Sequence, residues 1–154
     1  MKEIPLTRGK VALVDDDDYK RLSKFKWHLD HGYASRSGYN ENGGELKIYM
    51  HREINKTPSN MQTDHKNMDR LDNRKRNLRT CCKSQNMINR GNQSNNTSGF
   101  KGVHWHKYAK KWMASIKVNK VPIYLGLFVD PIEAARAYDK AAVKHFGEFA
   151  RPNL

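Results

Sequence analysis

The sequence predicts an α+β protein of two small domains, on the evidence of its length, one composition break and two residue patterns. Its 154 residues allow one ordinary domain or two small ones. Residues 91–99 are small, polar and uncharged, which is the composition of a linker. Short strand patterns precede this stretch, and an alternating strand pattern followed by a helix comes after it. We therefore expect domains at residues 1–90 and 100–154.

The first domain is expected to contain short strands and one helix. Strand-like runs cover residues 4–6 and 10–14, and further strands are expected at 27–29, 33–36 and 46–50, with a loop over 37–44. Four aspartates, residues 15–18, precede an apolar pattern. Acidic side chains favour a helix N-terminus, where the backbone N–H groups are positive. The same carboxylates could bind a metal ion, but a helix start is the favoured interpretation.

The second domain has the clearer pattern. Residues 111–118 alternate, so that one face of a strand carries Trp112, Ala114, Ile116 and Val118 and the other carries Lys111, Met113, Ser115 and Lys117. Flanking strands are expected at 103–106 and 121–127. Asp130 can cap a helix that starts at Pro131 and ends at Gly147. These patterns predict a three-stranded antiparallel sheet packed on one helix.

The charge balance points to a polyanionic partner. The chain has 29 Lys and Arg against 16 Asp and Glu, a formal net charge of +13. Residues 1–90 hold 19 of the basic and 12 of the acidic side chains, and residues 100–154 hold 10 and 4. Nucleic acid is the commonest such partner, because each neutralised phosphate releases counterions. Both domains are therefore expected to meet it, and RNA remains an alternative to DNA.

Other classes are disfavoured by what the sequence contains. The apolar runs are too short to span a membrane, and the chain is too small for a large enzyme core. The two cysteines, Cys81 and Cys82, are adjacent and cannot join distant segments, so we expect a reducing cytoplasm, in a bacterial or phage-infected cell. Without a C-x-x-C pair, a structural zinc site is not expected.

Chemically active side chains concentrate between residues 64 and 86. Asp64 and His65 are followed by Asn77 and then by Asn86, which are 12 and 21 residues after His65. Five basic residues fall within ten positions between them: Arg70, Arg74, Lys75, Arg76 and Arg79. A hairpin through residues 63–66 and 77–82, followed by a helix over 83–90, would bring Asp64 and Asn86 together. Any one of these residues could instead simply satisfy a turn.

The combined set suits hydrolysis of a phosphodiester. That reaction needs a base to activate water and a cation to stabilise the departing 3′ oxygen. An imidazole suits the first role, because its unperturbed pKa is about 6.5. Oxygen ligands from Asp and Asn side chains suit a hard divalent ion such as Mg²⁺, or Mn²⁺, whereas zinc would favour nitrogen or sulfur.

These residues resemble the HNH homing endonucleases of phages and mobile introns, in the variant with Asn as the final ligand. The resemblance lies in Asp64-His65, Leu71-Asp72-Asn73-Arg74, Asn77-Leu78-Arg79 and Gln85-Asn86, with Met50-His51-Arg52-Glu53 upstream. It implies a ββα-metal nuclease fold over about residues 45–90. It also implies that His65 is the general base, that Asp64 and Asn86 bind one metal ion, and that Asn77 holds the hairpin and orients His65.

Three further features belong to this motif. Arg74, Arg76 and Arg79 are expected to contact DNA. His51 and Arg52 match residues that often precede the motif, and for His51 packing or a phosphate contact is favoured over catalysis. Met68 stands where the family often has glycine, so the geometry of that turn is in question, because Gly tolerates backbone angles that Met does not.

The second domain resembles the plant APETALA/ethylene-response-factor DNA-binding domain. The likeness covers nearly all of residues 98–153 and lies in Lys101-Gly102-Val103, in residues 111–116, in Tyr124-Leu125-Gly126-Leu127-Phe128 and in residues 133–139. In that family the sheet enters the major groove. The resemblance implies that the DNA-binding residues are Lys101, His104, His106, Tyr108, Lys111, Ser115, Lys117 and Tyr124.

This domain also departs from its family. His104, His106 and Pro122 stand where Arg is usual, and the first turn has one extra residue. Arg bound to guanine is the commonest specific base contact, so we expect a weaker or different sequence preference. The expected function is a site-directed, homing-type DNA endonuclease. Its partner would be double-stranded DNA, with no small-molecule substrate, and it would be a monomer or weak dimer. The alternative is a DNA-binding protein whose nuclease half has decayed.

Overall fold

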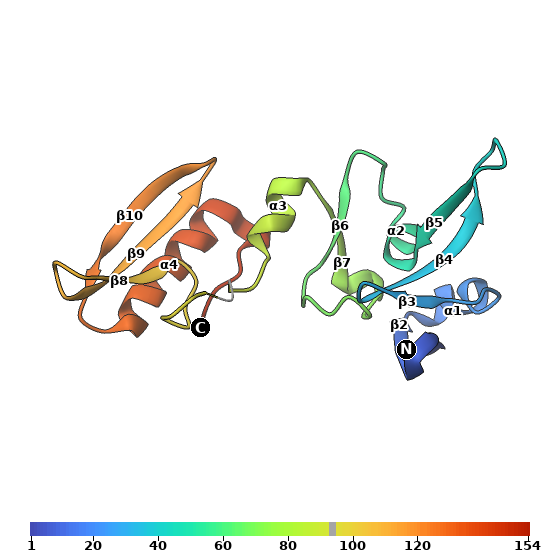
Figure 1. Ribbon diagram of the computed structural model, residues 1–154, viewed down its shortest axis with the longest axis horizontal. Helices are drawn as coiled ribbons and strands as arrows, with labels where there is room; N and C mark the ends of the chain where they lie inside the picture. The colour runs from blue at the N-terminus through green and yellow to red at the C-terminus, as the bar shows by residue number, and fades with distance from the viewer. Residues whose placement is uncertain (93–94) are drawn as a thin grey trace. The chain divides into compact units, whose positions relative to one another are not determined.

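The computed structural model describes residues 1–92 and 95–154, which form two compact units, Met1–Asn86 and Met87–Leu154 (Figure 1). Residues 93 and 94 belong to the expected linker at 91–99 and lie outside the described residues. Other parts of that stretch form hydrogen bonds within the second unit. The hydroxyl of Ser98 donates to the backbone carbonyl of Val103 (2.8 Å), and the amide nitrogen of Asn96 donates to the carbonyl of Phe100 (2.8 Å).

The first unit begins with a strand pair and a short helix. Strands β1 (Lys2–Pro5) and β2 (Val11–Val14) are antiparallel, and a short 3₁₀ turn, η1 (Thr7–Gly9), joins them. Helix α1 (Asp16–Leu22) has three aspartates in its first turn, as a helix start predicts. The expected helix at this position is confirmed.

A second sheet and a helix follow. Strands β3 (His28–Asp30), β4 (Tyr33–Tyr39) and β5 (Glu45–Tyr49) form an antiparallel sheet with β4 in the centre. Strand β4 continues to Tyr39 because residues 35–39 pair with β5, so the loop expected over 37–44 is shorter than predicted. Helix α2 (Met50–Asn55) was not predicted from the sequence. It is short, and its helical spacing is limited to Met50 and Ile54, which are both buried.

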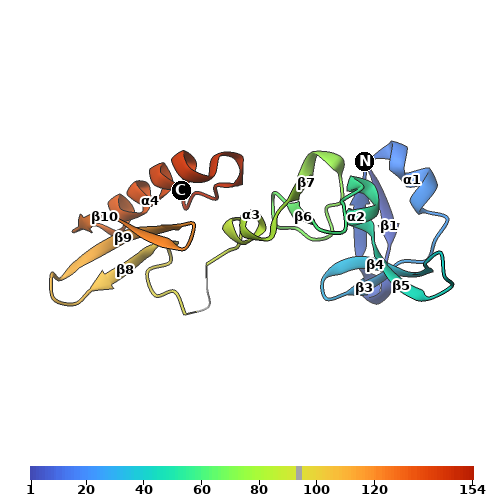
Figure 2. The ribbon, with the colours of Figure 1, turned by 90° about the horizontal axis from the view of Figure 1, so that it is seen from above.

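The last part of the first unit is a hairpin followed by a helix. Strands β6 (Gln62–His65) and β7 (Leu78–Cys81) are antiparallel, with the 3₁₀ turn η2 (Lys75–Asn77) before β7 and helix α3 (Lys83–Ile88) after it (Figure 2). The loop between the strands bonds to β2. The backbone N–H of Leu13 donates to the carbonyl of Leu71, and that of Asn73 donates to the carbonyl of Leu13, both at 2.8 Å.

One hydrophobic core supports this unit. It joins residues from β1, β2, α1, β4, α2 and β7: Ile4, Leu6, Ala12, Val14, Leu22, Trp27, Ala34, Met50, Ile54 and Leu78. Because Met50 and Leu78 belong to this cluster, burial of apolar surface fixes both α2 and β7 to the N-terminal strands. The hairpin therefore depends on the segments that precede it.

The second unit has the predicted architecture. Strands β8 (Val103–His106), β9 (Lys111–Val118) and β10 (Val121–Phe128) form an antiparallel sheet with β9 in the centre, and helix α4 (Pro131–Phe146) covers one face (Figure 1). The 3₁₀ turn η3 (Gly147–Phe149) follows α4. Asp130 caps α4 by accepting a 2.9 Å hydrogen bond from the backbone N–H of Ile132. The α+β class and this sheet-on-helix arrangement are confirmed.

Small residues bring the helix and the sheet together. Ala134, Ala135 and Ala142 of α4 are buried, and Ala114 and Ile116 of β9 face them in the core. Gly102 precedes β8 with φ +75°, and a Cβ there would lie 2.1 Å from the Tyr138 ring. Only glycine fits this crossing. Within the described residues, no helix is long and apolar enough to cross a membrane.

Candidate functional site

The β6–β7 hairpin positions Asp64 and His65 at its end. They are the last two residues of β6, and both are buried although they are polar. Asp64 pairs across the hairpin with Arg79, and His65 pairs with Leu78. Buried polar side chains are expected to be held by specific partners, and the structure shows partners for each.

The partner of Asp64 is the guanidinium of Arg79. Its Nε and Nη2 atoms both donate to Oδ2 of Asp64, at 2.8 and 2.6 Å. The side chains are only 6% and 10% exposed, so this ion pair is largely shielded from water. Arg79, predicted to contact DNA, thus neutralises a predicted metal ligand; whether it also reaches DNA stays a prediction.

Asn86 lies against the same face of β6 as Asp64. Its amide nitrogen donates to the Oε1 atom of Gln62, at 2.8 Å. Side chains two residues apart on a strand point to the same face, so Gln62 and Asp64 share one. Because this bond uses the amide nitrogen of Asn86, its amide oxygen is the atom it can offer as a ligand. A carboxylate and an amide oxygen on one face fit a hard divalent ion.

His65 is held by a different set of residues. Its Nε2 atom lies 3.3 Å from Oδ1 of Asn73, whose amide nitrogen donates to the carbonyl of Leu71. That second bond directs the amide oxygen toward His65, which favours the tautomer with the proton on Nε2 and the lone pair on Nδ1. Burial lowers the pKa of His65, which keeps the imidazole neutral and able to accept a proton.

His51 of α2 lies next to His65. The two ring centroids are 5.2 Å apart, and Tyr33 of β4 contacts both rings, at 5.0 Å from His51 and 6.0 Å from His65. Burial, and then the nearby His65 and Arg52, lower the pKa of His51 to about 3. His51 is therefore neutral at physiological pH. Its Nδ1 atom is buried and has no hydrogen-bond partner.

Asn77 closes the loop between the two strands. Its amide nitrogen donates to the backbone carbonyl of Asp72 at 2.7 Å, and its amide oxygen accepts from the backbone N–H of Asn67 at 3.0 Å. These bonds fit the expectation that Asn77 holds the hairpin. Met68 adopts φ +64°, the left-handed conformation that glycine would favour, and its N–H donates to the carbonyl of His65. The turn is thus formed without glycine.

The basic side chains of this loop are engaged with acids. Arg74 donates from Nε and Nη2 to the buried Asp72 carboxylate, both at 2.6 Å, and these bonds lower the pKa of Asp72. Lys75 bonds Asp17 and Asp18 of α1. The three aspartates 15, 17 and 18 could also surround an ion, but here they tie the loop to α1. Arg76 is exposed. Contact of Arg74 and Arg76 with DNA stays a prediction.

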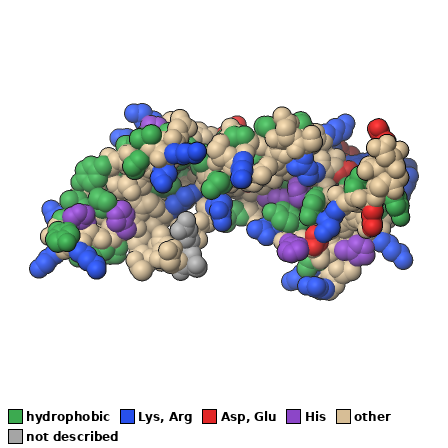
Figure 3. Space-filling model, turned by 45° about the horizontal axis from the view of Figure 1, so that its top comes forward, with side chains coloured by type: hydrophobic (Ala, Val, Ile, Leu, Met, Phe, Trp, Pro, Cys, Tyr) green, Lys and Arg blue, Asp and Glu red, His purple; other side chains and the backbone are tan. Residues whose placement is uncertain are grey.

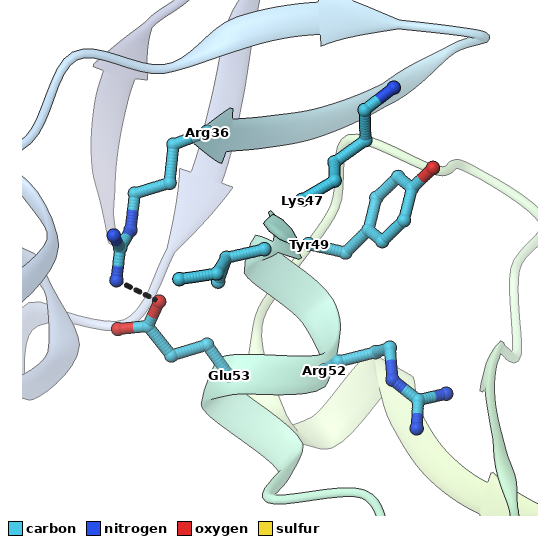
Figure 4. A pocket seen from close by; sticks show the side chains of 6 residues that line it. Arg36, Lys47, Tyr49, Arg52 and Glu53 are labelled. Carbon is cyan, nitrogen blue, oxygen red and sulfur yellow. Dashed lines mark hydrogen bonds and ion pairs between the residues drawn. The ribbon is translucent and has the colours of Figure 1, made fainter. Parts of the chain in front are cut away.

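An open pocket lies beside this site, between β4, β5 and α2 (Figure 4). Its charged lining residues are paired: Arg36 with Glu53 at 3.2 Å, and Lys47 with Asp30 at 2.9 Å. Arg52 donates to the backbone carbonyls of Met61, Thr57 and Pro58, at 3.0, 3.4 and 2.8 Å. Arg52 therefore fixes the segment that leads into β6.

Most of the predicted DNA-binding residues of the second unit share one face of its sheet. His104 pairs with Met113, His106 with Lys111, and Tyr124 with Ser115. Paired residues lie on the same face, and α4 covers the other one, which carries Val103, Ala114 and Ile116. The uncovered face thus presents His104, His106, Lys111, Ser115, Lys117 and Tyr124. Lys and Arg side chains are exposed on both units (Figure 3).

Two predicted contacts lie off this face. Tyr108 is in the turn between β8 and β9 and is almost fully exposed. Lys101 precedes β8, and its Nζ atom donates to the backbone carbonyls of Ile88 and Arg90. Lys101 thus binds the chain that enters this unit, and a contact between it and DNA stays a prediction.

Comparisons with known proteins identify the first unit. A family model described as HNH endonuclease matches residues 56–88, which span the hairpin and α3. HNH endonuclease L560 of Acanthamoeba polyphaga mimivirus is 31% identical over 152 residues, covering 95% of this chain and 76% of that protein. The chain belongs to the HNH endonuclease family. Membership of the HNH family indicates a nuclease, and the resemblance predicted from the motif is confirmed.

The second unit of this HNH protein is similar to plant transcription factors. Ethylene-responsive transcription factor ERN1 of Medicago truncatula is 36% identical over 86 residues, and APETALA2-like protein 2 of rice, Oryza sativa, is 45% identical over 60 residues. The matches cover 54% and 38% of this chain but only 32% and 14% of the plant proteins. The likeness therefore covers only part of each plant protein, supports an APETALA/ethylene-response-factor-like region in this chain and indicates DNA binding.

The structure adds site residues that the motif analysis did not select. Asn73 contacts His65, Gln62 bonds Asn86, and Tyr33 lies in ring contact with both histidines. Asn73 stood within the quoted motif, and Gln62 is two residues before Asp64, a spacing that places both on one strand face. Nothing in the sequence pairs Tyr33 with His51 or His65, which follow it by 18 and 32 positions.

Proposed function

We propose that this protein is a homing-type DNA endonuclease that cuts near a site held by its second unit. The observation that carries the proposal is the hydrogen bond between Asn86 and Gln62. Gln62 shares a face of β6 with Asp64, so this bond supports Asp64 and Asn86 as neighbouring oxygen donors on the strand that ends in His65. The family match over the same residues supports it. The substrate would be double-stranded DNA, and the protein would act as a monomer or weak dimer in the cytoplasm.

In this mechanism His65 takes a proton from the attacking water through Nδ1, while Asn73 holds Nε2. Asp64 and Asn86 would hold one Mg²⁺ or Mn²⁺ ion, which when bound supplies positive charge at the scissile phosphate and the departing oxygen. Asn77 keeps the loop closed, so that Asn73 stays beside His65. One such site acts on one strand at a time, which makes nicking the expected first product.

The second unit would anchor the protein. The exposed sheet face that carries Lys111, Ser115 and Lys117 would enter the major groove, and Arg76 of the first unit would contact the backbone. Tethering raises the local concentration of the nuclease at its target, so the first unit need not bind tightly by itself. Histidines 104 and 106 on this face would favour contacts to the DNA backbone over reading of guanine.

The proposal is tested by incubating supercoiled plasmid with the protein and Mg²⁺ or Mn²⁺, with EDTA in a parallel reaction. The His65→Ala variant should leave the plasmid supercoiled. His28→Ala is the matched control, because His28 is an exposed histidine of the same unit. Equal nicking by the His65→Ala variant would contradict the role of His65. Site-specific binding without nicking in any divalent metal would support the alternative of a decayed nuclease.

A further inference from the structure

The ring of His65 lies against two other rings, and the three come from separate elements. Tyr33 comes from β4, His51 from α2 and His65 from β6, and every pair of their ring centroids is within 6.0 Å. The His51 ring is nearest to His65, at 5.2 Å and with an interplanar angle of 70°. Asn73 holds a nitrogen of the same His65 ring. The position of His65 is thus set both by Asn73 of its own hairpin loop and by Tyr33 and His51 from outside the hairpin.

Packing alone does not account for an imidazole at position 51. The side chain is 8% exposed, and its Nδ1 atom is buried without a hydrogen-bond partner. A buried polar atom without a hydrogen-bond partner lowers the stability of the fold, whereas a hydrocarbon ring of similar shape at the same position would not. An unsatisfied buried polar atom calls for an explanation, and a catalytic role or a bound water molecule is among the recognised ones.

We propose that His51 is a positioning residue, which holds the His65 ring in the orientation that takes a proton from water and whose Nδ1 binds a water molecule when DNA assembles the site. The inference rests on the proposed function, since it assigns His51 to the same reaction. It gives the N-terminal sheet and α2 a role in cutting, because these elements deliver Tyr33 and His51 to the end of β6.

The test uses the full chain and compares variants at positions 51 and 49. His51→Phe keeps a ring but removes both nitrogens, and His51→Gln keeps a polar group of similar size. Tyr49→Leu is the matched control for packing. The Tyr49 ring belongs to the same cluster, with its centroid 6.0 Å from that of Tyr33 and 5.5 Å from that of His51. For each variant we would measure the single-turnover cleavage rate, the DNA dissociation constant, the melting temperature and the long-range ¹H–¹⁵N signals of the His65 ring.

The expected result is a loss of rate without a loss of binding. His51→Phe should cleave roughly ten-fold slower or worse, because small misplacements of a catalytic group are costly. Its DNA affinity should be unchanged, its melting temperature equal or higher, and its His65 ring signals shifted. His51→Gln should recover part of the rate, and Tyr49→Leu should lose rate only as far as its melting temperature falls.

Two outcomes would overturn the inference. The first is cleavage by His51→Phe at the original rate, and the second is a loss of rate that merely follows a loss of stability in both the position 51 and position 49 variants. If the original protein does not cut DNA with either metal, the proposed function fails. The His65 ring signals then still decide the positioning role: a shift in His51→Phe supports it, and unchanged signals refute it.

Discussion

Replacing Arg79 with methionine should destabilise the first unit, because Arg79 neutralises the buried carboxylate of Asp64. Its Nε and Nη2 atoms donate to Oδ2 of Asp64, and the two side chains are 10% and 6% exposed. Breaking a buried ion pair by removing one partner costs about 3–5 kcal/mol. Because Arg79 is not fully enclosed, we expect the lower end, about 3 kcal/mol. For a unit of this size, that corresponds to a melting temperature lower by on the order of 12–24 °C.

A divalent ion should restore much of this loss. In the variant, a metal ion held by Asp64 and Asn86 replaces the positive charge that Arg79 supplied. An ion at one hundred times its dissociation constant stabilises the folded state by about 2.7 kcal/mol, which is close to the loss. In the original protein Arg79 opposes the incoming cation, so Mg²⁺ should raise its melting temperature less than that of the variant.

The assay is thermal unfolding in EDTA and in Mg²⁺ or Mn²⁺, together with calorimetric titration of each metal. Arg76→Met is the matched control, because Arg76 lies in the same loop and its side chain is exposed. This variant should change neither the melting temperature nor the metal affinity appreciably. An Arg79→Met variant that melts like the original protein in EDTA, or equal stabilisation of both proteins by Mg²⁺, would contradict this prediction.

Three further predictions concern the loop and the second unit. Met68→Gly should raise the free energy of unfolding by up to about 1 kcal/mol, because φ +64° strains methionine but not glycine; chemical denaturation measures this, and a loss of stability would contradict it. The hydrogen bonds from Arg74 lower the pKa of Asp72, so its contribution to stability is present above the unfolded pKa of about 3.9 and is lost as the pH falls through the lower folded pKa. Asp72→Asn should therefore destabilise the protein at pH 7, and the difference should shrink below about pH 4; a difference that is constant with pH would refute this. A fragment of Met87–Leu154 should bind duplex DNA with an affinity that falls steeply as salt rises; no binding, or binding insensitive to salt, would rule out an anchoring role for it.

Local patterns predicted the second unit closely. The alternation over residues 111–118 matches β9, and the Asp130-Pro131 start and Gly147 end match α4. Here a strand period, a cap and a C-terminal glycine all lie within the segments they define. The bulge where β10 changes register at Gly126 was not predicted, because it depends on pairing with β9.

The candidate site was predicted less completely, because its contacts are long-range. Spacing within residues 64–86 was enough to expect the hairpin and to bring Asp64 near Asn86. The approach of Asp64 to Asn86 stays a prediction, supported by the bond between Asn86 and Gln62. Spacing could not reveal that Arg79 pairs with Asp64, since a basic residue beside a DNA-cutting motif also fits a phosphate contact. Helix α2 has only six residues, too few to show a clear helical period, so the place of His51 beside His65 emerged only from the fold.

The most direct test of a cutting unit joined to an anchoring unit is to map binding and cleavage on the same DNA. A selected site would be footprinted with the full chain, with its His65→Ala variant and with the Met87–Leu154 fragment, and the cut position would be mapped in Mg²⁺. We predict a shared core footprint for all three proteins, and a metal-dependent nick at a fixed distance from it with the full chain only. Cleavage by His65→Ala, or cuts unrelated to the footprint, would contradict it.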